Sequence, residues 1–274
     1  MSDTYNDVVR HYGEAGIGDR ILAALAEEGI DTDKLTTADL ATIDQFHTRG
    51  LPATREQADM VAPNAGTHVL DIGCCVGGPA RFLAETYGCR VTGIDLTEAY
   101  IEAAEMLSRR CGLDHLTNFR IANALDMPFD DATFDIAWTQ NVSMNIPDKD
   151  AFYASIFRTL KPGGKFSSSE VATGAAGDPV FPLPWAREPS ISFVASSDDM
   201  RASVEGAGFR ILDWQDTTAD AVAVFKNPNQ AARRGKLGVG LVAGADFGER
   251  SANLAQGMAE DRFESILFVA ERPE

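Results

Sequence analysis

The sequence contains few of the residues that mark disulfide-bonded or zinc-binding proteins. Only 4 cysteines occur in 274 residues, and two of them, Cys74 and Cys75, are adjacent. Neighbouring cysteines rarely bridge without strain, so we expect reduced thiols and no disulfide framework. The sequence has no CxxC or histidine-rich spacing, and we therefore expect no metal site.

Long apolar runs and positive charge are also scarce. The N-terminus, "MSDTYNDVVRHYGEAG", lacks the apolar region of a signal peptide, and no uninterrupted apolar stretch reaches membrane length. The formal net charge is −17, which argues against nucleic-acid and anionic-membrane partners, because phosphate contacts need clustered Lys and Arg. The same charge also suits simple solubility or a saline habitat. We expect a cytoplasmic protein.

The pattern of apolar residues divides the chain near residue 62. Residues 1–62 are predicted to be helical, with Ile17, Ile21, Leu22 and Leu25 at helical spacing. From Gly66 onward, predicted strands and helices alternate, which indicates an α/β protein with a parallel, doubly wound sheet. The predicted strands cover residues 67–73, 89–96, 116–124, 134–142, 165–172, 209–216 and 264–273. We therefore predict a Rossmann-like seven-stranded, mostly parallel sheet, with an insertion at about 219–263.

A glycine-rich turn follows the first predicted strand in "LDIGCCVGGPARFLA", residues 70–84. Gly73, Gly77 and Gly78 would permit unusual backbone angles and a close approach of a ligand. Asp95 ends the second predicted strand, where a carboxylate can accept both hydroxyls of a ribose. The spacing G-x-x-x-G-G differs from the G-x-G-x-x-G of pyrophosphate binders, which disfavours a nicotinamide oxidoreductase.

The ordered run "LDIGCCVGGPARFLA…GIDLT…ANALDMPF…FDIAWTQ…LKPGG" resembles the class I S-adenosylmethionine-dependent methyltransferases over about residues 66–172. The resemblance implies that residues 63–274 form the domain that binds S-adenosyl-L-methionine and that residues 1–62 form an N-terminal helical lid. It places the turn under the methionine part of the cofactor, Asp95 on the ribose and Asn123 with Ala124 at the adenine. The implied cofactor-binding residues are Thr48, Asp71, Gly73, Cys74, Cys75, Gly77, Asp95, Leu96, Asn123, Ala124 and Gln140.

Cys75 occupies a position where this family usually has glycine. A cysteine is acceptable there if its φ angle is below zero, and we then expect it to pack against the cofactor. The alternative is a redox or alkylation switch, because turn amides at a helix N-terminus can lower a thiol pKa.

The N-terminal helices and "WTQNVSMN" narrow the resemblance to the sarcosine/dimethylglycine and phosphoethanolamine N-methyltransferase type. The segment "DQFHTRGLPAT" would close over the cofactor, with Gln45, Phe46, His47, Thr48 and Arg49 as candidate contacts. Tyr5 and Tyr12 are candidates on the first helix. Phosphoethanolamine-type enzymes have an Asp and a His four residues apart after the fourth strand, where this chain has Asn141 and Asn145. Neither Asn is a general base near neutral pH, which puts a phosphobase substrate in doubt. The candidate catalytic residues are Tyr12, His47, Asn141 and Asn145.

These features predict an enzyme that methylates a small metabolite, most plausibly at nitrogen. Methylation of oxygen or sulfur in a natural product or thiol, and a catalytically silent cofactor-binding protein, remain alternatives. Trp185 is expected in the acceptor pocket. Arg187, in the same segment, is a candidate for binding a carboxylate through two hydrogen bonds. The insertion at 227–263 either covers the pocket or forms a contact in a homodimer.

Overall fold

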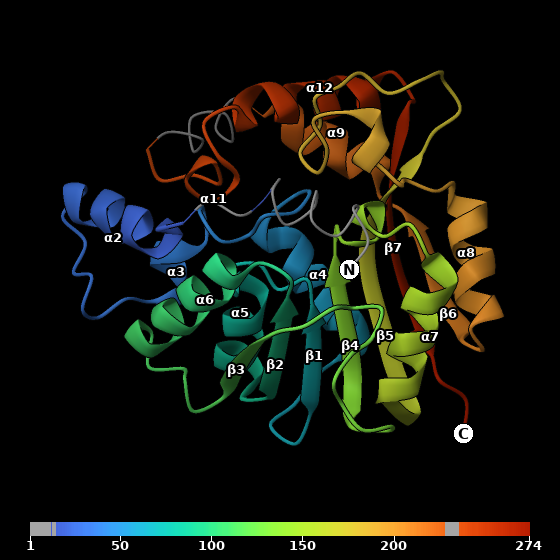
Figure 1. Ribbon diagram of the computed structural model, residues 1–274, viewed down its shortest axis with the longest axis horizontal. Helices are drawn as coiled ribbons and strands as arrows, with labels where there is room; N and C mark the ends of the chain where they lie inside the picture. The colour runs from blue at the N-terminus through green and yellow to red at the C-terminus, as the bar shows by residue number, and fades with distance from the viewer. Residues whose placement is uncertain (1–11, 13–14, 228–235) are drawn as a thin grey trace.

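The computed structural model describes Tyr12 and residues 15–227 and 236–274; Tyr5 lies outside the described residues. A seven-stranded sheet in the order β3-β2-β1-β4-β5-β7-β6 runs through the molecule (Figure 1). Strands β1 to β5 pair in parallel, whereas β7 is antiparallel to both β5 and β6. The strands are β1 (His68–Ile72), β2 (Arg90–Asp95), β3 (Thr117–Ile121), β4 (Phe134–Gln140), β5 (Leu160–Thr173), β6 (Arg210–Asp216) and β7 (Phe263–Glu271). The predicted Rossmann-like, mostly parallel sheet is confirmed.

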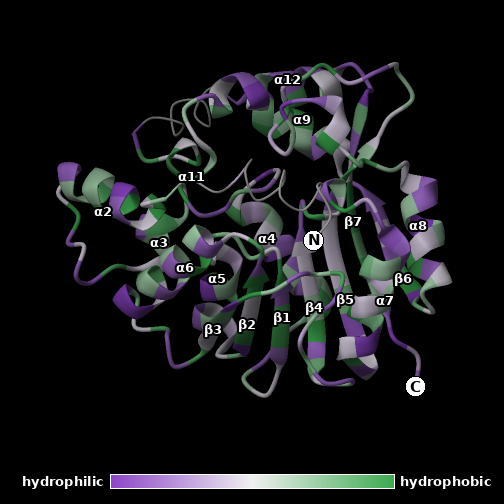
Figure 2. Ribbon diagram, viewed as in Figure 1, coloured by the Kyte–Doolittle hydropathy of each residue, from purple (hydrophilic) through white to green (hydrophobic). Residues whose placement is uncertain are grey.

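Helices cover both faces of the sheet. Successive residues of a central strand point to opposite faces, so both sets of side chains are buried. Leu70 and Ile72 of β1 pack with α7, whereas Val69 packs with α4 and α5. Figure 2 shows apolar residues concentrated along β1 and β2, whereas the helices around them carry both apolar and polar residues. The helices that flank the sheet are α4 (Leu51–Val61), α5 (Gly78–Tyr87), α6 (Glu98–Arg110), α7 (Lys149–Thr159) and α8 (Ser197–Gly206).

Two further groups of helices lie at the edge where the parallel strands end (Figure 1). The N-terminal group consists of α2 (Ile17–Glu27) and α3 (Thr37–Leu40), and α2 packs its Ile17, Ile21 and Leu25 against α6. The C-terminal insertion contains α9 (Thr218–Lys226), α11 (Gly240–Ala243) and α12 (Phe247–Ala259), and both α9 and α12 contact β7. The two groups meet where α11 contacts α2.

Local sequence explains where most helices begin and end. Thr36 and Asp39 form a reciprocal capping box at the start of α3, and Pro52 lies in the first turn of α4. Gly88 ends α5 and Gly112 follows α6, both at positive φ as expected for helix C-termini. The largest difference from the predicted strand boundaries is in β5, which already begins at Leu160 and includes the "KPGG" segment. No helix among the described residues is long and apolar enough to span a bilayer.

Candidate active site

A cavity of about 920 Å³ lies beyond the carboxyl ends of β1, β2, β3 and β4. This is the edge at which open α/β sheets bind ligands. Most of the residues that the sequence predicted for the site line it: Tyr12, His47, Thr48, Gly73, Cys75, Asp95, Leu96, Asn123, Ala124, Gln140, Asn141 and Asn145. Asp71 and Cys74 border a smaller adjoining cavity, and Gly77 lines neither of the two.

The glycines of the turn are needed chiefly for protein packing. Gly73 has φ 73°, and a Cβ there would lie 2.5 Å from Val142 Cγ2. A Cβ on Gly78 would lie 2.2 Å from the backbone oxygen of Asp44. Gly77 has φ 80°, and its Cβ would meet the ring of Phe119 at 2.8 Å. The expected close approach of a ligand therefore concerns Gly73, which lines the cavity, and not Gly77.

Cys75 differs from the sequence expectation in its backbone. Its φ is 50°, in the left-handed region that favours glycine, so the condition of a negative φ is not met. Burial and the charge of Asp95 raise the pKa of its thiol well above the usual range. A protonated thiol is a poor nucleophile, so the structure speaks against the redox-switch alternative and leaves Cys75 as part of the cavity wall.

Asp95 is fixed at the end of β2 by two backbone donors. Its Oδ2 accepts from Cys75 N at 3.0 Å, and its Oδ1 accepts from Thr97 N at 2.9 Å. Burial raises the pKa of this carboxyl, while the hydrogen bonds from Thr97 and Cys75 act in the opposite direction. Each carboxylate oxygen keeps a further acceptor position, so the group can bind two neighbouring hydroxyls in the cavity.

Asp71 is a buried carboxyl, and one of its two oxygens, Oδ2, has no hydrogen-bond partner among the described residues. Burial, followed by the negative charge of Asp95, raises the pKa of Asp71 to about 7. The adjoining cavity of about 20 Å³ borders Asp71, His47 and Gln140 and has room for one water-sized group. A cationic donor placed there would satisfy Asp71.

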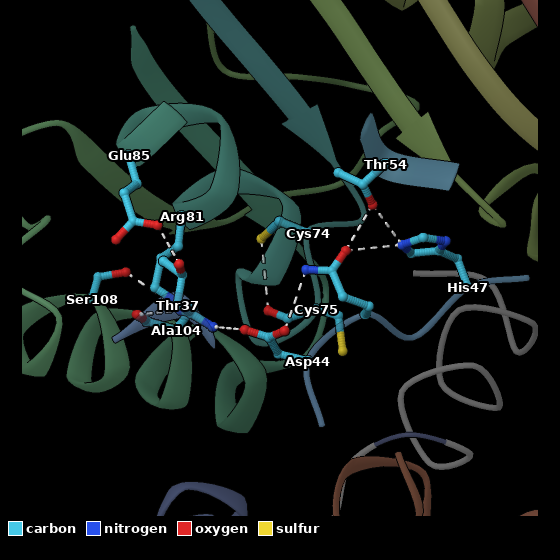
Figure 3. A network of polar contacts seen from close by, with 11 residues as sticks. Thr37, Asp44, His47, Thr54, Cys74, Cys75, Arg81, Glu85, Ala104 and Ser108 are labelled. Carbon is cyan, nitrogen blue, oxygen red and sulfur yellow. Dashed lines mark hydrogen bonds and ion pairs between the residues drawn. The ribbon is translucent and has the colours of Figure 1, made fainter. Parts of the chain in front are cut away.

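The segment from Asp44 to Gly50, the first part of the segment predicted to close over the cofactor, is largely buried. Arg81 Nη2 of α5 lies 2.8 Å from Asp44 Oδ2, and both side chains are closed to solvent (Figure 3). The same segment contacts Gly78 through the backbone of Asp44. The segment is therefore fixed to the helix that follows the glycine turn, and it forms a wall of the cavity.

His47 takes part in a polar network in this wall (Figure 3). Its Nδ1 is 3.2 Å from the backbone oxygen of Thr48, and its Nε2 is 3.2 Å from Gln45 Oε1 and 3.0 Å from Thr54 Oγ1. Burial lowers the pKa of His47 to about 4, so the imidazole is neutral at pH 7. A neutral ring has one N–H for these three oxygen neighbours, so a second N–H on a protonated ring would also find an acceptor.

Asn141 and Asn145 lie after β4 and face the N-terminal segments. Asn141 has φ 56°, and its Nδ2 donates to Thr48 Oγ1 at 3.1 Å. Asn145 Nδ2 donates to Tyr12 OH at 3.3 Å, and burial raises the pKa of Tyr12, which keeps the phenol protonated. The side-chain oxygens of both Asn residues are buried without a partner among the described residues. These two acceptors are available to a donor group on a ligand.

The segment that carries both Asn residues is held from below by Glu170 of β5. Glu170 Oε2 accepts from Val142 N at 3.1 Å, from Ser143 N at 3.0 Å and from Ser143 Oγ at 2.9 Å. On the other side, Lys149 Nζ donates to the backbone oxygens of Ser143 and Ile146. The sequence did not predict these roles of Glu170 and Lys149, because the local sequence around each residue does not show which backbone groups it binds.

The part of the cavity remote from Asp95 is predominantly apolar. It is formed by the segment after β4, the proline-rich segment and the C-terminal insertion, and its lining includes Met144, Trp185, Val224, Phe225, Leu241, Phe247 and Leu254. Trp185 and the described residues of the insertion thus line the cavity. Tyr100, also in the lining, was missed because its place in the predicted helix after Asp95 does not indicate that it faces a cavity.

Arg187 does not take the predicted place in the acceptor pocket. It forms a two-point ion pair with Asp246, from Nε to Oδ2 at 3.0 Å and from Nη2 to Oδ1 at 3.2 Å. Asp246 also accepts from Arg250 Nη2 at 2.9 Å. These contacts join the proline-rich segment to the insertion, and the carboxylate that Arg187 binds belongs to the protein itself.

Comparison with known proteins places these features in a family. Residues 70–168 match the family model described as "Methyltransferase domain". A 24-methylenesterol C-methyltransferase of Arabidopsis thaliana is 39% identical over 115 residues, which cover 42% of this chain and 32% of that protein. The chain thus matches about a third of the length of that relative.

Other relatives match over different shares of the chain. The O-methyltransferase resE of Aspergillus sclerotiorum is 27% identical over 221 residues, covering 80% of this chain and 81% of that protein. A sarcosine/dimethylglycine N-methyltransferase of Halorhodospira halochloris is 37% identical over 100 residues, 36% of each chain. The resemblance to the N-methyltransferase type is therefore confirmed, and it is shared with relatives named for other acceptor atoms.

Solved structures agree on the fold. The geranyl diphosphate methyltransferase in complex with geranyl diphosphate and sinefungin has a TM-score of 0.72 with 18% identity, over 99% of this chain and 100% of the other. A related structure of the same enzyme contains S-adenosylmethionine. The matched domain, the sheet order and the carboxylate at the end of β2 agree with one family. The chain belongs to the class I S-adenosylmethionine-dependent methyltransferases.

Proposed function

We propose that the protein transfers a methyl group from S-adenosylmethionine to a hydroxyl oxygen of a small molecule with a bulky, apolar body. The observation that carries this proposal is the continuity of the cavity. One volume of about 920 Å³ includes Asp95 and Asn123 on one side and Trp185, Phe225 and Leu254 on the other. A methyl donor and an apolar acceptor can therefore lie in contact within one cavity.

The polar half of the cavity fits the cofactor. Asp95 has free acceptor positions for the ribose hydroxyls, and the unpartnered Oδ2 of Asp71 suits the amino group of the methionine part. Asn123 and Ala124 border the cavity at the end of β3, where the adenine would lie. When bound, the cofactor supplies a methyl group that is already electrophilic because of its sulfonium charge. Most of the acceleration then comes from placing the acceptor in line with that methyl group, which is worth roughly 7–11 kcal/mol in well-oriented reactions.

The acceptor hydroxyl needs groups that orient it and remove its proton. The unpartnered side-chain oxygens of Asn141 and Asn145 are acceptors for this hydroxyl. His47 is neutral at pH 7 and can therefore accept the proton; burial disfavours the charged ring, and the oxygens of Gln45 and Thr48 partly offset that cost. We therefore assign the orienting role to Asn141 and Asn145 and the role of proton acceptor to His47. Tyr12, a protonated phenol, supports Asn145.

Oxygen is favoured over nitrogen by the charges around the cavity. Asp95 is the one carboxylate among the described lining residues, and it lies on the cofactor side. No acidic side chain in that lining is therefore available to hold an ammonium group in the apolar half. The relative resE, similar over 80% of this chain, is named an O-methyltransferase. Nitrogen, which the sequence favoured, remains the second candidate because the aromatic faces of Phe46, Trp185 and Phe247 could stabilise a developing cation.

A panel of matched acceptors tests the proposal. The protein is incubated with S-adenosylmethionine carrying a ¹³C methyl group and with 1-naphthol, 1-naphthylamine or 1-naphthalenethiol. Mass spectrometry then identifies the product. We expect labelled 1-methoxynaphthalene and at least about tenfold less of it with His47→Ala. Exclusive labelling of the amine would overturn the oxygen assignment, and the absence of any labelled product across a wider hydroxyl panel would support the silent binding protein.

A further inference from the structure

The lining of the cavity carries a positive balance in a strongly acidic chain. The chain has 24 basic and 41 acidic residues, yet the described lining contains Arg49, Arg55 and Lys236 against the single acid Asp95. Two of these cations are surface groups, because Arg55 is exposed above the ring of Phe82 and Lys236 lies near Glu27 with a mostly exposed side chain. Arg49 differs from both, since only 8% of its side chain is exposed.

One edge of the buried guanidinium of Arg49 is unused. Its Nη1 donates to Glu56 Oε2 at 2.7 Å and lies 3.8 Å from Asp220 Oδ2. Its Nε and Nη2 are buried and have no hydrogen-bond partner among the described residues. Nε–H and Nη2–H form the side of the guanidinium fork that binds the two oxygens of a carboxylate in parallel. An uncompensated buried donor pair of this kind calls for a ligand.

A second feature with the same preference lies next to Arg49. The helix α4 has 11 residues, and its N-cap, Gly50, provides no side-chain hydrogen bond to the first turn. Gly50 and Leu51, at the start of this helix, line the cavity together with Arg49. The N-terminus of a helix carries partial positive charge and favours an anion. Arg49 directly precedes this helix in the chain, so the guanidinium and the helix end belong to the same part of the cavity lining.

We propose that the corner of the cavity formed by Arg49 and the N-terminus of α4 binds a carboxylate carried by the methyl acceptor. The inference rests on the proposed function and specifies its substrate class: an apolar molecule with a hydroxyl to be methylated and an acidic group at a fixed distance from it. Because Nε and Nη2 are closed to water in the structure, the carboxylate reaches them with a small side-chain displacement at this corner. The two charge-assisted hydrogen bonds that form favour that displacement.

The two acidic side chains near Arg49 do not occupy the Nε/Nη2 edge of its guanidinium. Both Glu56 and Asp220 contact Nη1 and leave the Nε/Nη2 edge unused. Their side chains are 39% and 68% exposed, so solvent screens their repulsion of an incoming anion.

The test compares two ligands that differ in charge and share an apolar chain. Octanoate and 1-octanol are titrated calorimetrically into the full-length protein, with and without saturating S-adenosylhomocysteine. We expect octanoate to bind the wild-type protein at least about tenfold more tightly than octanol. Arg49→Gly should abolish this preference and leave octanol affinity within about twofold. Glycine suits the φ of 71° at this position, so the variant is expected to fold.

Two matched variants distinguish the planar guanidinium of Arg49 from a positive charge of any kind. Arg55→Ala removes a positive charge from the same cavity lining at an exposed position and should retain the octanoate preference. Arg49→Lys keeps the charge without the planar fork and should retain only part of it. Equal binding of octanoate and octanol to the wild type, or an equal loss with Arg49→Gly and Arg55→Ala, would overturn the proposal.

A further arm distinguishes the carboxylate of the acceptor from that of the cofactor. S-adenosylhomocysteine has a carboxylate, and 5′-methylthioadenosine lacks it. We expect Arg49→Gly to leave the affinities for both unchanged within about twofold. If the variant weakens S-adenosylhomocysteine alone by about tenfold or more, the corner serves the cofactor and the proposal fails, while the proposed function stands. Failure of the proposed function would appear separately, as a lack of methyl transfer by a protein that still prefers octanoate.

Discussion

Binding of S-adenosylhomocysteine should release a proton below pH 7, and Asp71 is the group that supplies it. Burial and the charge of Asp95 raise the pKa of Asp71 to about 7. We expect the ammonium group of the ligand beside the unpartnered Oδ2, where it stabilises the carboxylate. At pH 6 about nine-tenths of the Asp71 side chains are protonated before binding, and at pH 8 about one-tenth. The expected release is therefore about 0.9 proton at pH 6 and about 0.1 at pH 8.

This proton release also sets the pH dependence of affinity. The dissociation constant should rise by up to about tenfold for each pH unit below 7 and stay nearly constant above it. Asp71→Asn removes the titrating group, so the variant should bind weakly at every pH without this slope. Calorimetry at pH 6 in two buffers of different ionisation enthalpy counts the protons directly. A binding enthalpy independent of the buffer, or an unchanged slope in Asp71→Asn, would refute the placement of Asp71.

The same pKa predicts how stability depends on pH without the cofactor. The pKa of Asp71 in the folded protein lies above the value of 3.8 for an unperturbed Asp, so the fold favours the neutral carboxyl. Its contribution to stability is full below about pH 4 and is lost as the pH rises through about 7. The loss is at most about 4 kcal/mol, since each pH unit between the two pKa values corresponds to about 1.4 kcal/mol. Asp71→Asn should therefore raise the melting temperature at pH 8 more than at pH 4.

Four further substitutions have defined outcomes. Asp95→Ala should weaken S-adenosylhomocysteine binding by about tenfold or more, because two ribose hydroxyls lose a charged acceptor; an unchanged affinity in calorimetry would place the ribose elsewhere. Asp44→Ala should lower the free energy of unfolding in urea by about 3–5 kcal/mol, because Arg81 is left buried without its ion pair. Removal of the exposed pair Arg210–Glu271 by Glu271→Ala should cost less than about 1 kcal/mol, and equal losses in the two variants would contradict this reasoning. Cys75→Gly should retain methyl transfer and change the free energy of unfolding by less than about 1 kcal/mol, because relief of the φ of 50° offsets the greater freedom of glycine in the unfolded chain; a complete loss of activity would restore a reactive role for the thiol.

Local sequence predicted the order of the strands along the chain and the polar half of the site. The strand that ends at Ile72, the turn after it and Asp95 at the end of β2 follow from short apolar runs and from the glycine pattern. Parallel strands bring their carboxyl ends to one edge, and this rule places Asp95, Asn123 and Gln140 around one cavity. These features depend on short stretches of sequence, which is why they can be predicted.

Contacts between residues far apart in the chain could not be predicted from the sequence pattern. Nothing in the sequence around Asp44 indicates a buried ion pair, but Arg81, 37 positions away in the chain, pairs with Asp44 and fixes the segment to α5. The positive φ of Cys75 is set by the path between β1 and α5, which residue type alone does not reveal. Arg187 was expected to bind a ligand, yet Asp246 of the insertion satisfies it. In each case, a partner distant in sequence determines the role of the residue.

The crystal structure of the complex with S-adenosylhomocysteine tests the central claim most directly. We predict both ribose hydroxyls about 3 Å or less from the carboxylate oxygens of Asp95, with the amino group of the ligand facing Asp71. A complex in which the nucleoside occupies another part of the molecule, or in which a different side chain binds the ribose, would contradict the account.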